Sequence, residues 1–120
     1  GEIVASNEFY DYKAKYIDNK SVSVIPADIP ADITAKIQAL AVETYQALEC
    51  EGFSRVDFFI DRDNGNIYLN EVNTLPGFTE ISMYPKMWEA AGLAYDKLLA
   101  KLIELAEERF ADRAKNSIDC

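Results

Sequence analysis

The sequence predicts an α+β fold in which antiparallel strands pack with helices, and three patterns support this. Two strand-like runs, 54–61 and 66–73, flank an Asn-Gly turn, which is a strong hairpin signal. Apolar residues recur at helical spacing over 33–48 and again over 95–114. The chain has 120 residues, of which 49% are hydrophobic and 28% charged, as expected of one globular domain.

Composition excludes several classes of function. The net charge of -9 argues against a protein that binds nucleic acid through its phosphate backbone. The absence of histidine excludes catalytic triads of the Ser-His-Asp type and histidine metal sites from this segment. Cys50 and Cys120 lack zinc-site spacing, which favours reduced thiols and a cytoplasmic location. No apolar run reaches the roughly 20 residues that span a membrane, so we expect no membrane partner.

The first part of the chain predicts two short strands around a long loop. Residues 1–8 form the first strand, and residues 9–25 form an ordered loop that ends in a short strand over 21–25. Its first half, 9–16, carries four aromatic residues and two lysines. In the simpler interpretation these aromatic side chains pack on the domain while the lysines stay in water. Because the chain starts at Gly1 and enters a strand at once, we expect it to be a piece of a longer protein.

The remaining elements follow from local signals. The helix over 33–48 is expected to end at Gly52, where a left-handed residue can close it. After the hairpin, residues 74–84 form a loop that turns at Pro76-Gly77. A short helix should run from Pro85 to Gly92, and a longer one should follow.

The hairpin is expected to bring carboxylates together. Alternation places Arg55, Asp57 and Phe59 on one face of the first strand, and Leu69, Glu71 and Asn73 on one face of the second. A turn at Asp63-Asn64-Gly65 then sets Asp57 opposite Glu71, Arg55 opposite Asn73 and Phe59 opposite Leu69.

Two opposed carboxylates need a compensating charge. Their repulsion at about 4 Å costs about 4 kcal/mol at an effective dielectric constant of ~20. Arg55 can offset part of it, and a divalent cation would do so better. Oxygen ligands favour Mg²⁺ or Mn²⁺ over zinc. The alternative is a solvated hairpin face with an ordinary salt bridge. Glu71 favours the metal site, because its strand has the pattern of a buried run.

Three segments together resemble one family. They are Phe9-Tyr10-Asp11-Tyr12-Lys13-Ala14-Lys15-Tyr16, then 55–59, then 69–79, and the match continues through 82–85 into the closing helices. In order and spacing they are similar to the C-terminal part of D-alanine–D-alanine ligases. The resemblance implies the C-terminal lobe of an ATP-grasp fold, incomplete as given. It also implies a division into a lid loop at about 9–25, a metal-site hairpin at about 54–73, a substrate loop over 74–84 and C-terminal helices over 85–114.

The resemblance assigns metal and catalytic roles to the hairpin and the loop after it. Asp57, Glu71 and Asn73 match the ligands of two Mg²⁺ or Mn²⁺ ions at the phosphates of ATP, with Glu71 bridging both ions. Arg55 matches the arginine that stabilises the oxyanion of a tetrahedral intermediate. Gly77 matches a backbone N–H donor beside that oxyanion.

The resemblance assigns substrate roles to five further positions. Ser82, with the Met83 backbone, matches the group that holds the carboxylate of the second D-alanine. Lys15 matches a loop lysine that reaches the terminal phosphate of ATP, and Phe9 falls in the same ATP-binding segment. Tyr16 matches the loop position associated with acceptor choice, and tyrosine there is typical of dipeptide-forming enzymes.

The implied reaction joins two D-alanines at the expense of ATP for peptidoglycan synthesis. D-alanine–D-serine or D-alanine–D-lactate ligation remains an alternative, as does a non-catalytic ATP-grasp-like binding module. The fragment alone is expected to be inactive, because the lobes that complete the family's site precede it. Members of the family are often dimers, so a homodimer of the full-length protein is open.

Overall fold

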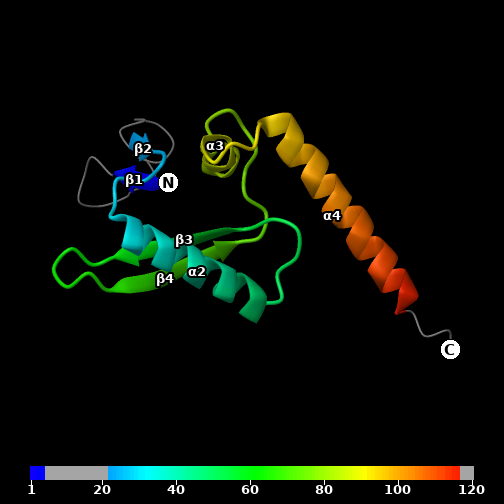
Figure 1. Ribbon diagram of the computed structural model, residues 1–120, viewed down its shortest axis with the longest axis horizontal. Helices are drawn as coiled ribbons and strands as arrows, with labels where there is room; N and C mark the ends of the chain where they lie inside the picture. Colours follow the sequence, from blue (N-terminus) through cyan, green and yellow to red (C-terminus); the bar gives the residue numbers. More distant parts are fainter. Residues whose placement is uncertain (5–21, 117–120) are drawn as a thin grey trace.

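The computed structural model describes residues 1–4 and 22–116, and it confirms the α+β prediction (Figure 1). Over these residues the strands form two separate two-stranded antiparallel sheets. The predicted loop residues Phe9, Lys15 and Tyr16 lie outside the described residues. In chain order the elements are β1 (Glu2–Val4), β2 (Val22–Val24), α2 (Ala31–Ala47), β3 (Arg55–Ile60), β4 (Ile67–Asn73), α3 (Met83–Ala90) and α4 (Tyr95–Lys115).

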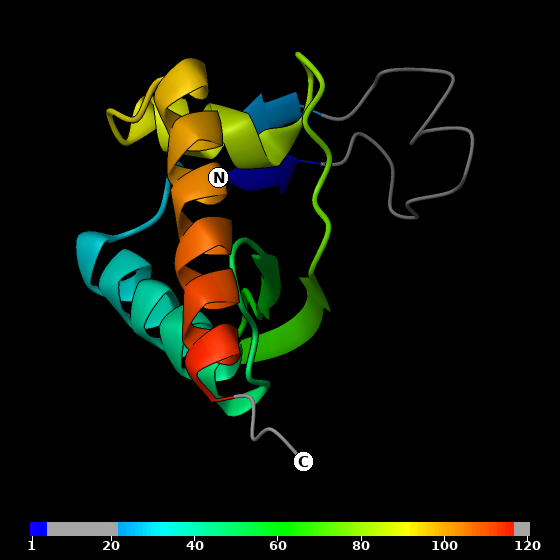
Figure 2. The same cartoon turned by 90° about the vertical axis from the view of Figure 1, so that its right-hand side faces the viewer.

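The small sheet of β1 and β2 lies beside α3 in both ribbon views (Figures 1 and 2). Val4 pairs with Val22, so the two residues that flank segment 5–21 are held together by the ladder. The contact with α3 is close, because a Cβ placed on Gly1 would lie 2.6 Å from Cε of Met83. The described residues on either side of segment 5–21 therefore lie beside α3.

The hairpin of β3 and β4 has the predicted register at its open end only. Arg55 pairs with Asn73 and Asp57 with Glu71, as expected. The pairing then shifts, so that Phe58 lies opposite Leu69 and the predicted Phe59–Leu69 pair is wrong. The cause is an extra residue in β4 between positions 69 and 71, which forms a β-bulge.

The turn of the hairpin is built by its own side chains. Oδ1 of Asp61 accepts the N–H of Asp63 at 2.8 Å, and the carbonyl of Asp61 accepts the N–H of Gly65 at 2.8 Å. Gly65 has φ of 72°, a left-handed conformation that glycine adopts without steric cost. The Asn-Gly signal therefore marks the turn correctly.

Helix α2 ends at Ala47, five positions before the predicted stop at Gly52. The left-handed residue that closes it is Glu49, with φ of 51°. The N–H of Cys50 donates to the carbonyl of Tyr45, and the N–H of Glu49 donates to Gln46, which is the Schellman pattern of hydrogen bonds. Glycine was the wrong marker here, because these two hydrogen bonds hold a glutamate in the left-handed region.

Helices α3 and α4 follow the substrate loop. Helix α3 begins at Met83, two residues before the predicted start at Pro85. Proline is tolerated there, because the first four N–H groups of a helix have no partner within it. Gly92, with φ of 95°, closes α3 as predicted. Helix α4 packs against α3 near its start and then extends away from it (Figure 1).

Little of the chain is fully covered. Among the described residues, the buried hydrophobic side chains are Tyr84 and Leu98. The radius of gyration is 17.1 Å, whereas a compact domain of this length has about 14 Å. Phe110, a member of the predicted apolar stripe of α4, is 77% exposed. The apolar stripe of α4 is covered mainly in the first turns of the helix, where it packs against α3.

Candidate functional site

Arg55 bridges two carboxylates on one face of the hairpin. Its Nε donates to Oδ1 of Asp57 at 2.8 Å, and its Nη2 donates to Oδ2 of Asp57 at 2.9 Å. The same Nη2 lies 3.6 Å from Oε1 of Glu71. Paired hydrogen bonds of this kind fix the plane of a guanidinium relative to its carboxylate. The arginine is therefore held rigidly between the two acids.

The three charges leave a net negative site. Asp57 and Glu71 face each other across the ladder, and Arg55 supplies one positive charge against their two negative charges. The hydrogen bond to Asp57 raises the pKa of Arg55, so the guanidinium stays charged. One uncompensated negative charge remains on this face, which is a condition that favours binding a cation.

Glu71 is more accessible than its sequence pattern indicates. Its side chain is 58% exposed, and most of β4 around it is exposed, so the prediction of a buried run is wrong. The β-bulge breaks the alternation from which that burial was inferred, and Leu69 is 52% exposed. The carboxylate can therefore be reached from solvent within the part of the chain that is described.

Asn73 is oriented by the backbone that follows it. Its Oδ1 accepts the N–H of Leu75 at 3.0 Å, which holds the side chain at the end of the hairpin. A carbonyl oxygen has a second lone pair, so Oδ1 can still act as a ligand. Asn73 also lies opposite Arg55 in the register.

The donor set fits a magnesium-type ion. Asp57, Glu71 and Asn73 offer only oxygen atoms, which suits Mg²⁺ or Mn²⁺. Within residues 1–4 and 22–116 there is no group of three or more His, Cys, Asp or Glu side chains placed to hold a metal. An ion on this face would thus have two carboxylates and an amide from the chain, and would complete its coordination with water or phosphate oxygens.

The loop after β4 forms a second group around Ser82. A Cβ placed on Gly77 would lie 2.9 Å from Oγ of Ser82, so a side chain at position 77 would force the Ser82 hydroxyl to move. Oγ of Ser82 accepts the N–H of Thr79 at 2.9 Å and lies 2.8 Å from Oγ1 of Thr79. Within the described residues the N–H of Gly77 donates no hydrogen bond, so it remains available to a ligand.

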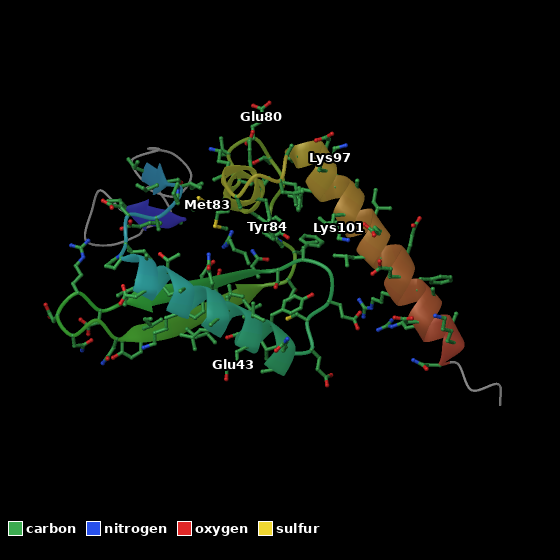
Figure 3. The ribbon with its side chains drawn as sticks, viewed as in Figure 1. Glu43, Glu80, Met83, Tyr84, Lys97 and Lys101 are labelled. Atoms are coloured by element: carbon green, nitrogen blue, oxygen red, sulfur yellow. The ribbon has the colours of Figure 1, made fainter. Side chains whose placement is uncertain are left out.

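An aromatic cluster packs against this loop through Phe78. The ring of Phe78 lies 5.5 Å from those of Phe53 and Tyr84, and 6.1 Å from that of Tyr95. The hydroxyl of Tyr95 donates to the carbonyl of Phe78 at 3.1 Å. In Figure 3, Tyr84 points from α3 toward the hairpin while Glu80 points outward. Burial of Tyr84 raises the pKa of its hydroxyl.

Sequence reasoning missed the residues that support the loop. Thr79 falls at the end of the matched segment 69–79, and Tyr95 falls at the start of the helix predicted over 95–114. Tyr95 lies 17 positions from Phe78, and no spacing rule links the two. The aromatic cluster has one local signal in the sequence, which is the pair Tyr84 and Trp88. They lie one helical turn apart, and their ring centroids are 6.4 Å from each other.

The structure thus assembles two groups of the predicted site residues. Arg55, Asp57, Glu71 and Asn73 form one on the hairpin, and Gly77 and Ser82 form the other. Figure 2 shows the segment after β4 rising from the hairpin to the layer of α3. Within the described part of the chain, no hydrogen bond or ion pair joins the two groups directly. The side chain of Met83 lies against Gly1, which leaves only its backbone near Ser82.

Comparison with known proteins identifies the family of the chain. The family model described as D-ala D-ala ligase C-terminus matches residues 1–104. A D-alanine–D-alanine ligase from Acetivibrio thermocellus is 53% identical over 115 residues, covering 96% of this chain and 31% of that protein. The chain therefore belongs to the family of D-alanine–D-alanine ligase C-terminal domains, and it spans about a third of the length of its relatives.

Solved structures show the same likeness. The D-alanine–D-alanine ligase from Coxiella burnetii superposes with a TM-score of 0.72 at 47% identity, covering 74% of this chain and 25% of that one. The ligase from Bacillus anthracis complexed with ATP gives a TM-score of 0.74 at 36% identity, covering 92% of this chain and 36% of that one. No helix within the described residues is long and apolar enough to cross a membrane.

Proposed function

We propose that this chain forms the C-terminal part of an ATP-dependent ligase that joins two D-alanines to D-alanyl-D-alanine for peptidoglycan synthesis in the cytoplasm. The observation that carries the proposal is the placement of Arg55, Asp57, Glu71 and Asn73 on one face of the hairpin. Family membership supports it, because the matched relatives are D-alanine–D-alanine ligases. The relative that was solved with ATP supports ATP as the nucleotide.

The proposed reaction has two steps. The carboxylate of the first D-alanine attacks the γ-phosphorus of ATP, which forms an acyl phosphate and releases ADP. The amine of the second D-alanine then attacks the acyl carbon, the tetrahedral intermediate expels phosphate, and the amine loses a proton. Mg²⁺ or Mn²⁺, held by Asp57, Glu71 and Asn73, would neutralise charge on the phosphates.

Arg55 is suited to the second step. Its Nε and Nη2 are engaged by Asp57 and Glu71, and within the described residues its Nη1 has no partner. The free Nη1 can therefore donate to the oxyanion of the tetrahedral intermediate. A cation that is already fixed by two acids needs no reorganisation when that charge develops. The N–H of Gly77 is the second donor in this proposal.

The remaining assignments complete the site. Ser82 and the Met83 backbone receive the carboxylate of the second D-alanine. Lys15 and Phe9 contact ATP, and Tyr16 acts at the acceptor. Closing the 9–25 lid would exclude water, which matters because an acyl phosphate hydrolyses readily. The homodimer of the full-length protein stays a prediction.

Product analysis of the full-length protein tests the proposal. D-alanine, D-serine and D-lactate are offered together with ATP and Mg²⁺, and the products are separated by mass spectrometry. We expect D-alanyl-D-alanine with one ADP per dipeptide. A mixed product containing D-serine or D-lactate would overturn the acceptor assignment. Absence of ADP would favour a binding module instead.

The isolated chain offers a second test of the same proposal. Residues 1–120 carry the hairpin face but span about a third of the relatives. We expect the isolated chain to release no ADP from ATP and D-alanine. Stoichiometric ADP release would show that the chain needs no other part of a longer protein for catalysis.

A further inference from the structure

We propose that Thr79 is a positioning residue that directs the proton of the Ser82 hydroxyl toward a bound carboxylate. The inference rests on the proposed function, because it takes Ser82 as the group that holds the acceptor amino acid. It adds a residue whose role follows from hydrogen bonds in this structure. The two residues lie in one turn, in which the N–H of Ser82 donates to the carbonyl of Thr79 at 3.0 Å.

The Ser82 hydroxyl is not used where its position would predict. Ser82 is the N-cap residue of α3, and serine at that position usually accepts an N–H from the first turn of its helix. Here the side chain makes no capping hydrogen bond. Its Oγ instead faces Thr79, which lies outside the helix. The helix thus forgoes a stabilising cap and leaves the hydroxyl held at the loop.

Thr79 can fill both acceptor positions of Ser82. The N–H of Thr79 donates to Oγ of Ser82 at 2.9 Å and takes one lone pair. Oγ1 of Thr79 lies 2.8 Å from the same oxygen, where either hydroxyl can be the donor. When Thr79 donates, both lone pairs of Ser82 are occupied, and its own proton is free to point outward.

A bound carboxylate selects that arrangement. An ionised carboxylate only accepts hydrogen bonds, so it requires Ser82 to donate. The donation from Thr79 also polarises the Ser82 hydroxyl and strengthens the outward hydrogen bond. Glycine at position 77 leaves the space beside the hydroxyl open, because a Cβ there would come within 2.9 Å of Oγ. The two contacts with Thr79 therefore favour an orientation in which the Ser82 proton points away from Thr79.

Substitution of Thr79 in the full-length enzyme tests the inference. Thr79→Val keeps the shape and the backbone N–H but removes the hydroxyl, whereas Thr79→Ser restores it. We expect Thr79→Val to raise KM for the acceptor D-alanine about tenfold, with kcat and the KM of the donor D-alanine changed less than about twofold. Thr79→Ser should return the acceptor KM to within about twofold of wild type.

A double-mutant cycle separates positioning from a general structural role. If Thr79 acts through Ser82, Thr79→Val should have little further effect in a Ser82→Ala background. Equal acceptor KM values in wild type and Thr79→Val would overturn the inference. So would a full effect of Thr79→Val without Ser82, or a failure of Thr79→Ser to restore binding.

Crystal structures distinguish this inference from the proposed function. If the wild-type enzyme forms no dipeptide, the proposed function fails, and the position of the Ser82 hydroxyl still decides the role of Thr79. In wild type we expect Oγ of Ser82 to lie within hydrogen-bond distance of Oγ1 of Thr79, and in Thr79→Val we expect it to stay beside the retained N–H of residue 79. A wild-type Ser82 whose Oγ instead capped α3 would show that Thr79 does not hold the hydroxyl.

Discussion

The hairpin face and the loop after it hold their functional groups by different means. Arg55, Asp57 and Glu71 stand on paired strands, where the backbone ladder sets their positions and their side chains are 26%, 32% and 58% exposed. Gly77 and Ser82 stand on a loop that has no ladder and depends on aromatic packing beneath it. The hairpin should therefore tolerate loss of a functional side chain, whereas the loop should lose its geometry when its support is removed.

The largest expected effect is on the support of the loop. Tyr84 is 7% exposed and its ring contacts Phe53, Phe78 and Trp88. We expect Tyr84→Ala to lower the free energy of unfolding by about 3–5 kcal/mol, as for other large aromatic residues removed from a core. Thermal denaturation of the full-length protein measures the change.

Tyr84→Phe is the matched control, because it retains the ring and removes only the hydroxyl. It should keep most of the stability. If Tyr84→Ala melted within about 1 °C of wild type, a change well below the several degrees that 1 kcal/mol gives in a small domain, the cluster would not support the loop. The contrast between the two regions would then be lost.

The second largest effect is expected on the turnover of the full-length enzyme, through Glu71 on the hairpin. Glu71→Gln removes one of the two opposed charges while keeping the shape of the side chain. We expect turnover to fall by about a hundredfold or more, because several kcal/mol of metal-dependent stabilisation is lost. The rise in melting temperature that Mg²⁺ produces in wild type should also disappear.

Glu43→Gln is a suitable control, since Glu43 is an exposed acid on α2 and its loss changes the net charge equally. Its turnover and its response to Mg²⁺ should match wild type. Similar activities for the two variants would argue that the hairpin acids are a solvated surface.

A smaller effect should follow from the hydrogen bond that joins α4 to the loop. Tyr95→Phe removes the donor to the Phe78 carbonyl and keeps the ring. We expect a loss of about 1 kcal/mol in stability and a higher KM for the acceptor D-alanine, since Phe78 lies between Gly77 and Thr79. An unchanged acceptor KM in steady-state assays would show that the loop is held without Tyr95.

The smallest expected effect is a gain in the free energy of unfolding, whereas the preceding substitutions cause losses. Like charges directly opposed across strands destabilise a sheet, so Glu71→Gln should leave stability without Mg²⁺ unchanged or raise it by about 0.2–1 kcal/mol. Arg55→Ala should lower it, because both acids then lose their shared cation. Parallel melting curves of the two variants test this difference in sign. A clear loss of stability in Glu71→Gln would place Glu71 among the structural residues.

Much of the hairpin could be predicted because its signals are local. The Asn-Gly turn and the alternation of side chains set Asp57 against Glu71, and the register agrees. The prediction failed beyond that pair, where the bulge at position 70 shifts Leu69 to face Phe58. Whether a strand takes an extra residue depends on the sheet as a whole. No residue near position 70 gives a local signal for this β-bulge.

The support of the loop could not be predicted in the same way. The contacts of Phe78 with Phe53 and Tyr95 join residues that are far apart in the chain. Ser82 bonds to Thr79, although serine at an N-cap usually bonds to its own helix. The end of α2 was also misplaced, because glycine is favoured in the left-handed region without being required there, and Glu49 adopts it.

The sequence by itself determined the family, the hairpin and which oxygen-bearing residues are proposed as metal ligands, since turn chemistry and side-chain alternation act over a few residues. Only the tertiary structure decided that Arg55 bridges both acids, that Glu71 is exposed and that Thr79 holds the Ser82 hydroxyl. These features depend on how side chains meet across strands and turns. Packing and hydrogen bonding decide which side chains come into contact, and a local sequence pattern does not encode that result.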